Sequence, residues 1–141
     1  MDAALYRFRL LNASNARIFR VARSDGRPLV LIGGDGGFLS APVMVPYVDL
    51  GTAERADLLV DFGDLAPGAA VSLVSLAFPS PSMGGRMGPM GRGMGPMRGR
   101  GRMGGTGPGA AQGAAMELVE LRVARRVRDS AAVPAALPAA P

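Results

Sequence analysis

Short runs of alternating apolar and polar residues recur along the first 80 residues and once more near residue 120. In Leu5–Leu11, three apolar side chains at every second position alternate with two arginines, which places them on one face of an extended strand. Ala56–Phe62 alternates in the same way, and no segment repeats its apolar residues every 3.6 positions. We therefore expect almost no helix and a β-sandwich or barrel. The seven expected strands are Leu5–Leu11, Ala16–Arg23, Pro28–Ile32, Pro42–Leu50, Ala56–Phe62, Ala70–Ala77 and Met116–Val123.

Turn-forming residues separate these runs. Ser24–Arg27 has Asp-Gly at its centre, which predicts a tight hairpin turn. Gly33–Gly37 contains four glycines in five residues, which predicts a loop. Pro46 interrupts a strand-like run and indicates an edge strand or a bulge.

The composition changes sharply after residue 79. Residues 80–115 include 13 glycines and six methionines among 36 residues, so we expect a disordered Met/Gly/Arg-rich insertion. Residues 129–141 are rich in alanine and proline, which is typical of a linker. The predicted folded domain therefore comprises residues 1–79 and 116–128.

The charge is unevenly distributed. The formal net charge is +5, and five of the 16 basic residues, all of them arginine, lie in 80–115, where no acid occurs. The remaining 11 arginines match 11 acids, so the chain outside this segment is neutral overall, unlike a nucleic-acid-binding domain. The insertion lacks the aromatic residues that usually stack on bases, which makes a nucleic-acid partner unlikely. No apolar run is long enough to predict a membrane span, and no signal-peptide pattern precedes the first strand.

Neither cysteine nor histidine occurs in the sequence. These residues alone can therefore supply no thiolate nucleophile, no imidazole base and no thiolate or imidazole metal ligand. Asp57 and Asp61 share one face of a strand, but their Cα atoms are about 13 Å apart, too far for a glycosidase-type carboxylate pair. The sequence therefore offers no catalytic residue.

The methionines of the insertion are the candidate metal ligands. Thioether sulfur is a soft, neutral ligand that suits Cu(I) and binds it without losing a proton. Five arginines in the same segment repel a cation, however, so a linker whose methionines bind nothing remains an alternative. The candidates are Met83, Met87, Met90, Met94, Met97 and Met103.

Three separated motifs match one known family in order and spacing. They are RFRLLNASNAR from Arg7, the Ser24–Gly26 turn that leads into IGGDGG, and ERADLLVDF from Glu54. Together they resemble the second domain of three-domain multicopper oxidases of the copper-efflux, spore-coat laccase and bilirubin oxidase type. The resemblance implies a cupredoxin-like Greek-key β-sandwich, truncated here at its N-terminal strand. One departure is Thr52-Ala53, where the family usually has Pro-Gly.

The resemblance also implies an activity for a longer parent protein. Such enzymes pass electrons from a substrate through copper to O₂, and their first and third domains hold the copper with His- and Cys-containing motifs. This chain would then be a non-catalytic middle scaffold, inactive alone, whose partners are the flanking first and third cupredoxin domains. A periplasmic or extracellular location is implied by the family only. The alternative is a free-standing Cu(I)- or Ag(I)-binding module without enzymatic activity.

Overall fold

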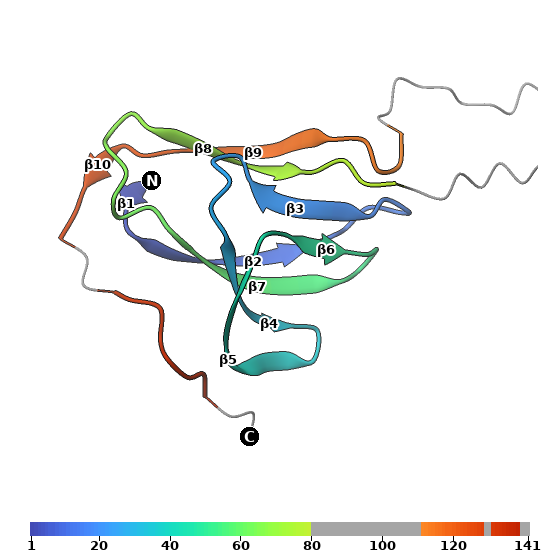
Figure 1. Ribbon diagram of the computed structural model, residues 1–141, viewed down its shortest axis with the longest axis horizontal. Helices are drawn as coiled ribbons and strands as arrows, with labels where there is room; N and C mark the ends of the chain where they lie inside the picture. The colour runs from blue at the N-terminus through green and yellow to red at the C-terminus, as the bar shows by residue number, and fades with distance from the viewer. Residues whose placement is uncertain (80–110, 129–130, 139–141) are drawn as a thin grey trace, which may run out of the picture.

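The computed structural model describes residues 1–79, 111–128 and 131–138, and every regular element in these ranges is a strand (Figure 1). Strands β2, β7, β4 and β5 form one antiparallel sheet in that order, the first sheet, and β6, β3, β8 and β9 form the second sheet. The predicted all-β sandwich is confirmed. None of the described residues belongs to a helix that could cross a membrane. The strands are β1 (Asp2–Ala3), β2 (Leu5–Leu11), β3 (Phe19–Arg23), β4 (Leu29–Gly34), β5 (Gly37–Val45), β6 (Val48–Leu50), β7 (Arg55–Asp61), β8 (Ala70–Ser75), β9 (Met116–Arg122) and β10 (Arg125–Arg126).

The core lies between the two sheets and follows the alternation in the sequence. Leu58 and Val60 project inward from β7 and are almost fully buried. Phe62, directly after β7, is also fully buried, and its ring lies 6.0 Å from that of Tyr6 and 6.3 Å from that of Phe8. Edge-to-face contacts of this kind stabilise a core beyond the area that they bury.

The Asp-Gly turn forms, but it does not make the predicted hairpin. The Gly26 N–H donates to the Arg23 carbonyl at 3.2 Å, and Gly26 has a φ of +74°. The strands on either side of the turn nevertheless lie in different sheets, because β3 pairs with β6 and β8 while β4 pairs with β5 and β7. The chain changes sheets again between β5 and β6 and between β6 and β7, which is the Greek-key connectivity expected of this fold class.

The prediction of a five-residue glycine loop was wrong in its extent. β4 continues through Gly34 and β5 starts at Gly37, so only two residues lie between the strands. A Cβ on Gly33 would lie 2.7 Å from the Gly37 carbonyl oxygen, and Gly37 itself has a φ of +104°. The glycines therefore allow a close hairpin rather than an open loop.

The two prolines near residue 45 lie in and just after the edge strand of the first sheet. Pro42 is inside β5, which is the last strand of the first sheet. The register between β4 and β5 jumps from Leu31–Val43 to Gly33–Phe38, so Pro42 lies in a bulged stretch. Pro46 itself lies outside both strands, between β5, which ends at Val45, and β6. The prediction of one strand over Pro42–Leu50, with Pro46 at an edge or a bulge inside it, was therefore wrong, because the chain crosses from the first sheet to the second at this point.

Segments from the two ends of the described chain pack on the sandwich. β1 pairs with β10 in parallel, and Arg125 Nε donates to Asp2 at 2.8 Å. The segment 131–138 runs from β10 to the side of β5 (Figure 1), where the Leu137 N–H donates to the Ser40 carbonyl at 3.1 Å. The domain and linker boundaries drawn from composition remain predictions.

Candidate functional site

The six predicted ligand methionines lie outside the described residues, but the base of their segment is described. The Phe78 N–H donates to the Gly113 carbonyl at 3.0 Å, so the described residues before and after segment 80–110 lie side by side. Arg17 Nη1 lies 3.3 Å from the Ala111 carbonyl and 3.8 Å from Met116 Sδ. This base therefore presents a guanidinium and one thioether rather than a cluster of anionic ligands.

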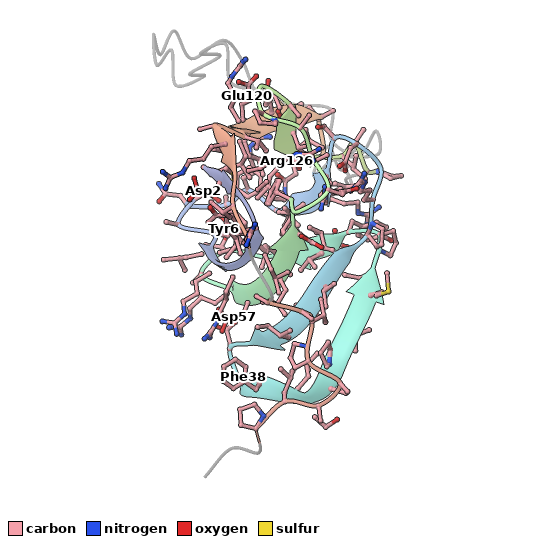
Figure 2. All side chains as sticks on the ribbon, turned by 90° about the vertical axis from the view of Figure 1, so that its left-hand side faces the viewer. Asp2, Tyr6, Phe38, Asp57, Glu120 and Arg126 are labelled. Carbon is pink, nitrogen blue, oxygen red and sulfur yellow. The ribbon has the colours of Figure 1, made fainter. Side chains whose placement is uncertain are left out.

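Acidic side chains within the described ranges are engaged by arginines and backbone amides. No group of three or more His, Cys, Asp or Glu that could hold a metal ion occurs there. Asp57 forms an ion pair with Arg7 and lies 3.9 Å from Arg9 Nε, on the side of the first sheet that Figure 2 shows with Phe38. Asp61 accepts from the Gly63 N–H at 2.7 Å. These carboxylates stabilise strands and turns.

Exposed ion pairs also shift some ionisation equilibria. The hydrogen bond from Arg125 holds the pKa of Asp2 below its usual value. The hydrogen bonds from Arg55 do the same for the pKa of Asp35, and that from Arg27 for the pKa of Asp64. All of these shifts keep the carboxylates charged, so none of them prepares a group for acid–base chemistry.

Asn12 is a buried hub between the two sheets. Its Nδ2 donates to the Arg17 carbonyl at 2.7 Å and to the Leu50 carbonyl at 2.9 Å. Its Oδ1 accepts from Ser14 N at 3.0 Å and from Ser14 Oγ at 2.7 Å. The backbone of Asn12 accepts from Ala53 N and donates to Glu54 O, so two of the motifs that carry the family resemblance meet here. Their role in this chain is structural.

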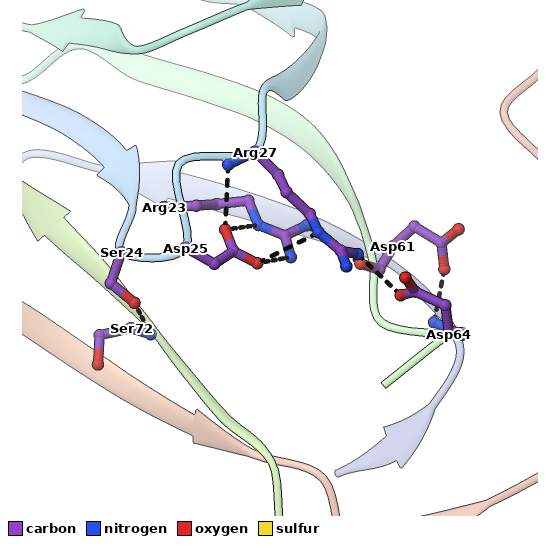
Figure 3. A network of polar contacts seen from close by, with 8 residues as sticks. Arg23, Ser24, Asp25, Arg27, Asp61, Asp64 and Ser72 are labelled. Atoms are coloured by element: carbon purple, nitrogen blue, oxygen red, sulfur yellow. Dashed lines mark hydrogen bonds and ion pairs between the residues drawn. The ribbon is translucent and has the colours of Figure 1, made fainter. Parts of the chain in front are cut away.

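A second polar network surrounds the Asp-Gly turn (Figure 3). The Arg23 side chain is only 3% exposed and lies 5.3 Å above the ring of Phe62. It donates to both carboxylate oxygens of Asp25, at 2.9 and 2.5 Å, and to the Asp61 carbonyl at 3.1 Å. Burial opposes the ionisation of Asp25, but the hydrogen bonds from Arg23 and Arg27 outweigh it and lower the pKa of Asp25.

An apolar groove opens between β2 and β9, each of which is the first or last strand of its sheet. It has a volume of about 460 Å³, and Leu10, Phe19 and Leu118 are among the side chains that line it. Phe8 and Leu10, which project from β2 beside this groove, are half-buried and pack against the core. This edge of the described sandwich is therefore concave and mainly apolar.

Known proteins resemble the chain in sequence and in fold, although no protein-family model matches it. The cell division protein FtsP of Shigella dysenteriae is 51% identical over 73 residues, which are 48% of this chain and 16% of that protein. A multicopper oxidase of Arabidopsis thaliana is 40% identical over 77 residues, which are 55% of this chain and 13% of that protein. A variant of the multicopper oxidase McoA from Aquifex aeolicus superposes with a TM-score of 0.72 and 26% identity, over 99% of this chain and 25% of that one. In sequence and in fold, the chain therefore resembles part of the multicopper oxidases.

The chain spans a quarter or less of the length of each of these three proteins. The cupredoxin-like fold implied by the three sequence motifs is confirmed by the superposition with the Aquifex enzyme. The chain therefore corresponds to part of a longer, multi-domain type of protein.

Copper is the cofactor that the multicopper oxidase family implies. The sequence has no histidine or cysteine, and the described residues contain no carboxylate cluster that could replace them. These residues do not fit a cupric centre. The cuprous site at the six methionines remains a prediction.

Two arginines that hold the sandwich together were not singled out from the sequence. Arg23 follows Phe19 and Val21 at every second position, and this spacing alone places its side chain on the buried face. Arg20 lies on the opposite face between two aromatic rings that come from distant segments. Only the three-dimensional structure brings those rings together.

Proposed function

We propose that this chain is the middle, non-catalytic scaffold domain of a longer multicopper oxidase, whose other domains hold the copper. The observation that carries the proposal is the superposition of 99% of the chain on only 25% of the Aquifex enzyme. The lack of imidazole and thiolate ligands supports a division of labour in which copper chemistry happens elsewhere. The sandwich would then hold the catalytic domains at a fixed spacing.

The test compares the longer protein with the 141-residue chain. The longer protein should bind copper, show blue absorption and consume O₂ when it oxidises a phenol. The isolated chain, loaded with Cu(II) in the same way, should do none of these. A blue, phenol-oxidising 141-residue chain would contradict the scaffold assignment.

The Met-rich segment gives the proposal its second part, which is the gathering of Cu(I) for the parent enzyme. Competition with a cuprous chelator should show weaker binding when all six candidate methionines are replaced by leucine. The matched control replaces Met44 and Met116, which are exposed on the described sandwich. If the six-fold variant binds Cu(I) as tightly as the unchanged chain, the methionines are not ligands. The same titration tests the alternative of a free-standing Cu(I)- or Ag(I)-binding module.

The relative named as a cell division protein suggests a second candidate function, a role in division without oxidase activity. Its 51% identity exceeds the 40% of the plant oxidase over a similar length. The two candidates differ in the copper content of the longer protein. A purified longer protein that takes up no copper and oxidises no phenol would favour the division role.

A further inference from the structure

The outward side of the second sheet carries an apolar and aromatic surface around one arginine. Alternation in β3 directs Phe19 and Val21 to the core, so Arg20 projects outward. Neighbouring outward positions are taken mostly by apolar residues, and a sandwich usually has polar residues on its outer faces. We call this surface the Arg20 patch, and it comprises Ile18, Arg20, Tyr47, Leu76 and Phe78.

The strands hold this patch in a fixed arrangement. The Arg20 guanidinium lies 4.3 Å from the centre of the Tyr47 ring and 5.2 Å from that of Phe78. Asp49, its partner across β3 and β6, accepts from Nε at 2.8 Å and from Nη2 at 2.9 Å. The side chains are therefore already ordered, which lowers the entropy cost of docking a partner.

Apolar groups on the Arg20 patch remain open to solvent. Ile18 is 40% exposed, and Tyr47 and Leu76 are each 38% exposed. Tyrosine and arginine with surrounding apolar groups are enriched at the energetic centres of protein interfaces. The centre of the first sheet's outer face is different, because Arg7, Arg9 and Asp57 form ion pairs there.

We propose that the Arg20 patch is the surface against which another domain of the longer polypeptide packs. The occupant would present a neutral apolar surface with a hydrogen-bond acceptor for the N–H groups of Arg20 that Asp49 does not engage. This inference rests on the proposed function, since it needs a multi-domain parent. The chain accounts for 16% and 25% of two of the proteins that it resembles, so most of such a polypeptide lies outside it.

The chemistry of the patch favours a domain over other occupants. Asp49 neutralises Arg20 at the centre, so the patch lacks the concentrated positive charge that nucleic acid or an anionic membrane would need. A domain on the same polypeptide is held at high effective concentration, so a modest surface is enough to dock it. A second copy of the chain would lack this advantage.

The test is hydroxyl-radical footprinting of the longer protein. Tyr47, Ile18 and Leu76 should be labelled several-fold less than their exposure in the isolated sandwich implies. Leu11 and Met44, on the first sheet and 60% and 70% exposed, are the internal controls and should be labelled freely. Labelling of Tyr47 in step with these controls would overturn the inference.

A variant of the longer protein gives an independent check. Ile18→Glu with Leu76→Glu should open the interface and raise the labelling of Tyr47 several-fold, whereas Leu11→Glu should leave it unchanged. Protection of Tyr47 that disappears on dilution, together with a dimer–monomer transition, would identify a second copy as occupant and overturn the proposal. The footprint needs no copper. A protected Arg20 patch in a longer protein that binds no copper would therefore refute the oxidase assignment and leave this inference standing. An exposed Arg20 patch in an active oxidase would refute this inference and leave the oxidase assignment standing.

Discussion

Replacement of Asn12 by alanine should destabilise the fold more than any other single change in a turn. The substitution removes four side-chain hydrogen bonds, two donated by Nδ2 and two accepted by Oδ1. The carbonyls of Arg17 and Leu50 lose a donor in a place where Asn12 itself is only 3% exposed. Water cannot easily replace that donor at Leu50, which is also buried.

The expected cost follows from the burial of each bond. A buried polar group left without its partner costs about 1–3 kcal/mol, and a part-buried hydrogen bond contributes about 1 kcal/mol. One buried and three part-buried bonds, partly compensated by water at Ser14, give a loss of about 3 kcal/mol. This is a large share of the roughly 5 kcal/mol available to a domain of this size.

Urea unfolding of the 141-residue chain, followed by circular dichroism, measures the change. Asn12→Ala should lower the midpoint by about 3 M for a slope near 1 kcal/mol/M, and the slope itself should stay the same. Asn15→Ala is the matched control, because Asn15 lies in the same turn but is exposed. Ser14→Ala should fall between the two, since it removes the Oγ bond to Oδ1 but keeps the backbone N–H bond to Oδ1 and both bonds from Nδ2. Equal midpoints for Asn12→Ala and Asn15→Ala would refute the claim that the hydrogen bonds of the Asn12 side chain stabilise the fold.

Three further predictions concern charge and the open edge. Arg23→Met should lower the free energy of unfolding by about 3 kcal/mol, because it leaves Asp25 without its buried partner. Arg27→Met removes a half-exposed ion pair and should lower the free energy of unfolding by less than about 1 kcal/mol. Equal losses for the two variants in urea unfolding would contradict this prediction. Because the pKa of Asp25 is lowered in the folded state, its carboxylate stabilises the fold above the unfolded-state pKa of about 3.9, and this stabilisation is lost as the pH falls through the folded-state pKa. Asp25→Asn should therefore reduce the loss of stability at acid pH in a series of urea midpoints. An unchanged dependence of the midpoint on pH would contradict this prediction. The isolated chain should self-associate through the open edge of β9. Leu118→Lys on that edge should reduce the association measured by sedimentation. The control Glu120→Lys, on the outward face of the same strand, should leave the association unchanged.

Much of the fold could be predicted from local alternation. The predicted strand Ala56–Phe62 differs from β7 by one residue at each end, because a strictly alternating run has only one way to bury its apolar face. Leu5–Leu11 coincides with β2 for the same reason. Alternation determines which side of a strand is buried, and this is enough to predict a sandwich.

Strand pairing could not be predicted in the same way. Asp25-Gly26 determines a local reversal, whereas the sheet in which β4 lies depends on contacts with β7, more than 20 residues later. The extent of β4 was missed because a glycine count does not show that the Gly33 position must leave room for the Gly37 carbonyl. The Arg20 patch depends on Tyr47 and Phe78, which are distant in sequence from each other and from Arg20.

Because Phe78 and Gly113 are joined by a hydrogen bond, the fold of the sandwich depends little on the length of the chain between them. Because loop-closure entropy grows only with the logarithm of length, halving or doubling such a segment changes the folding free energy by about 0.6 kcal/mol. Insertions, deletions and substitutions between these two residues can therefore accumulate at little cost to the sandwich. If the methionine spacing is maintained among descendants of this sequence, the cause would have to lie outside the folding of the sandwich.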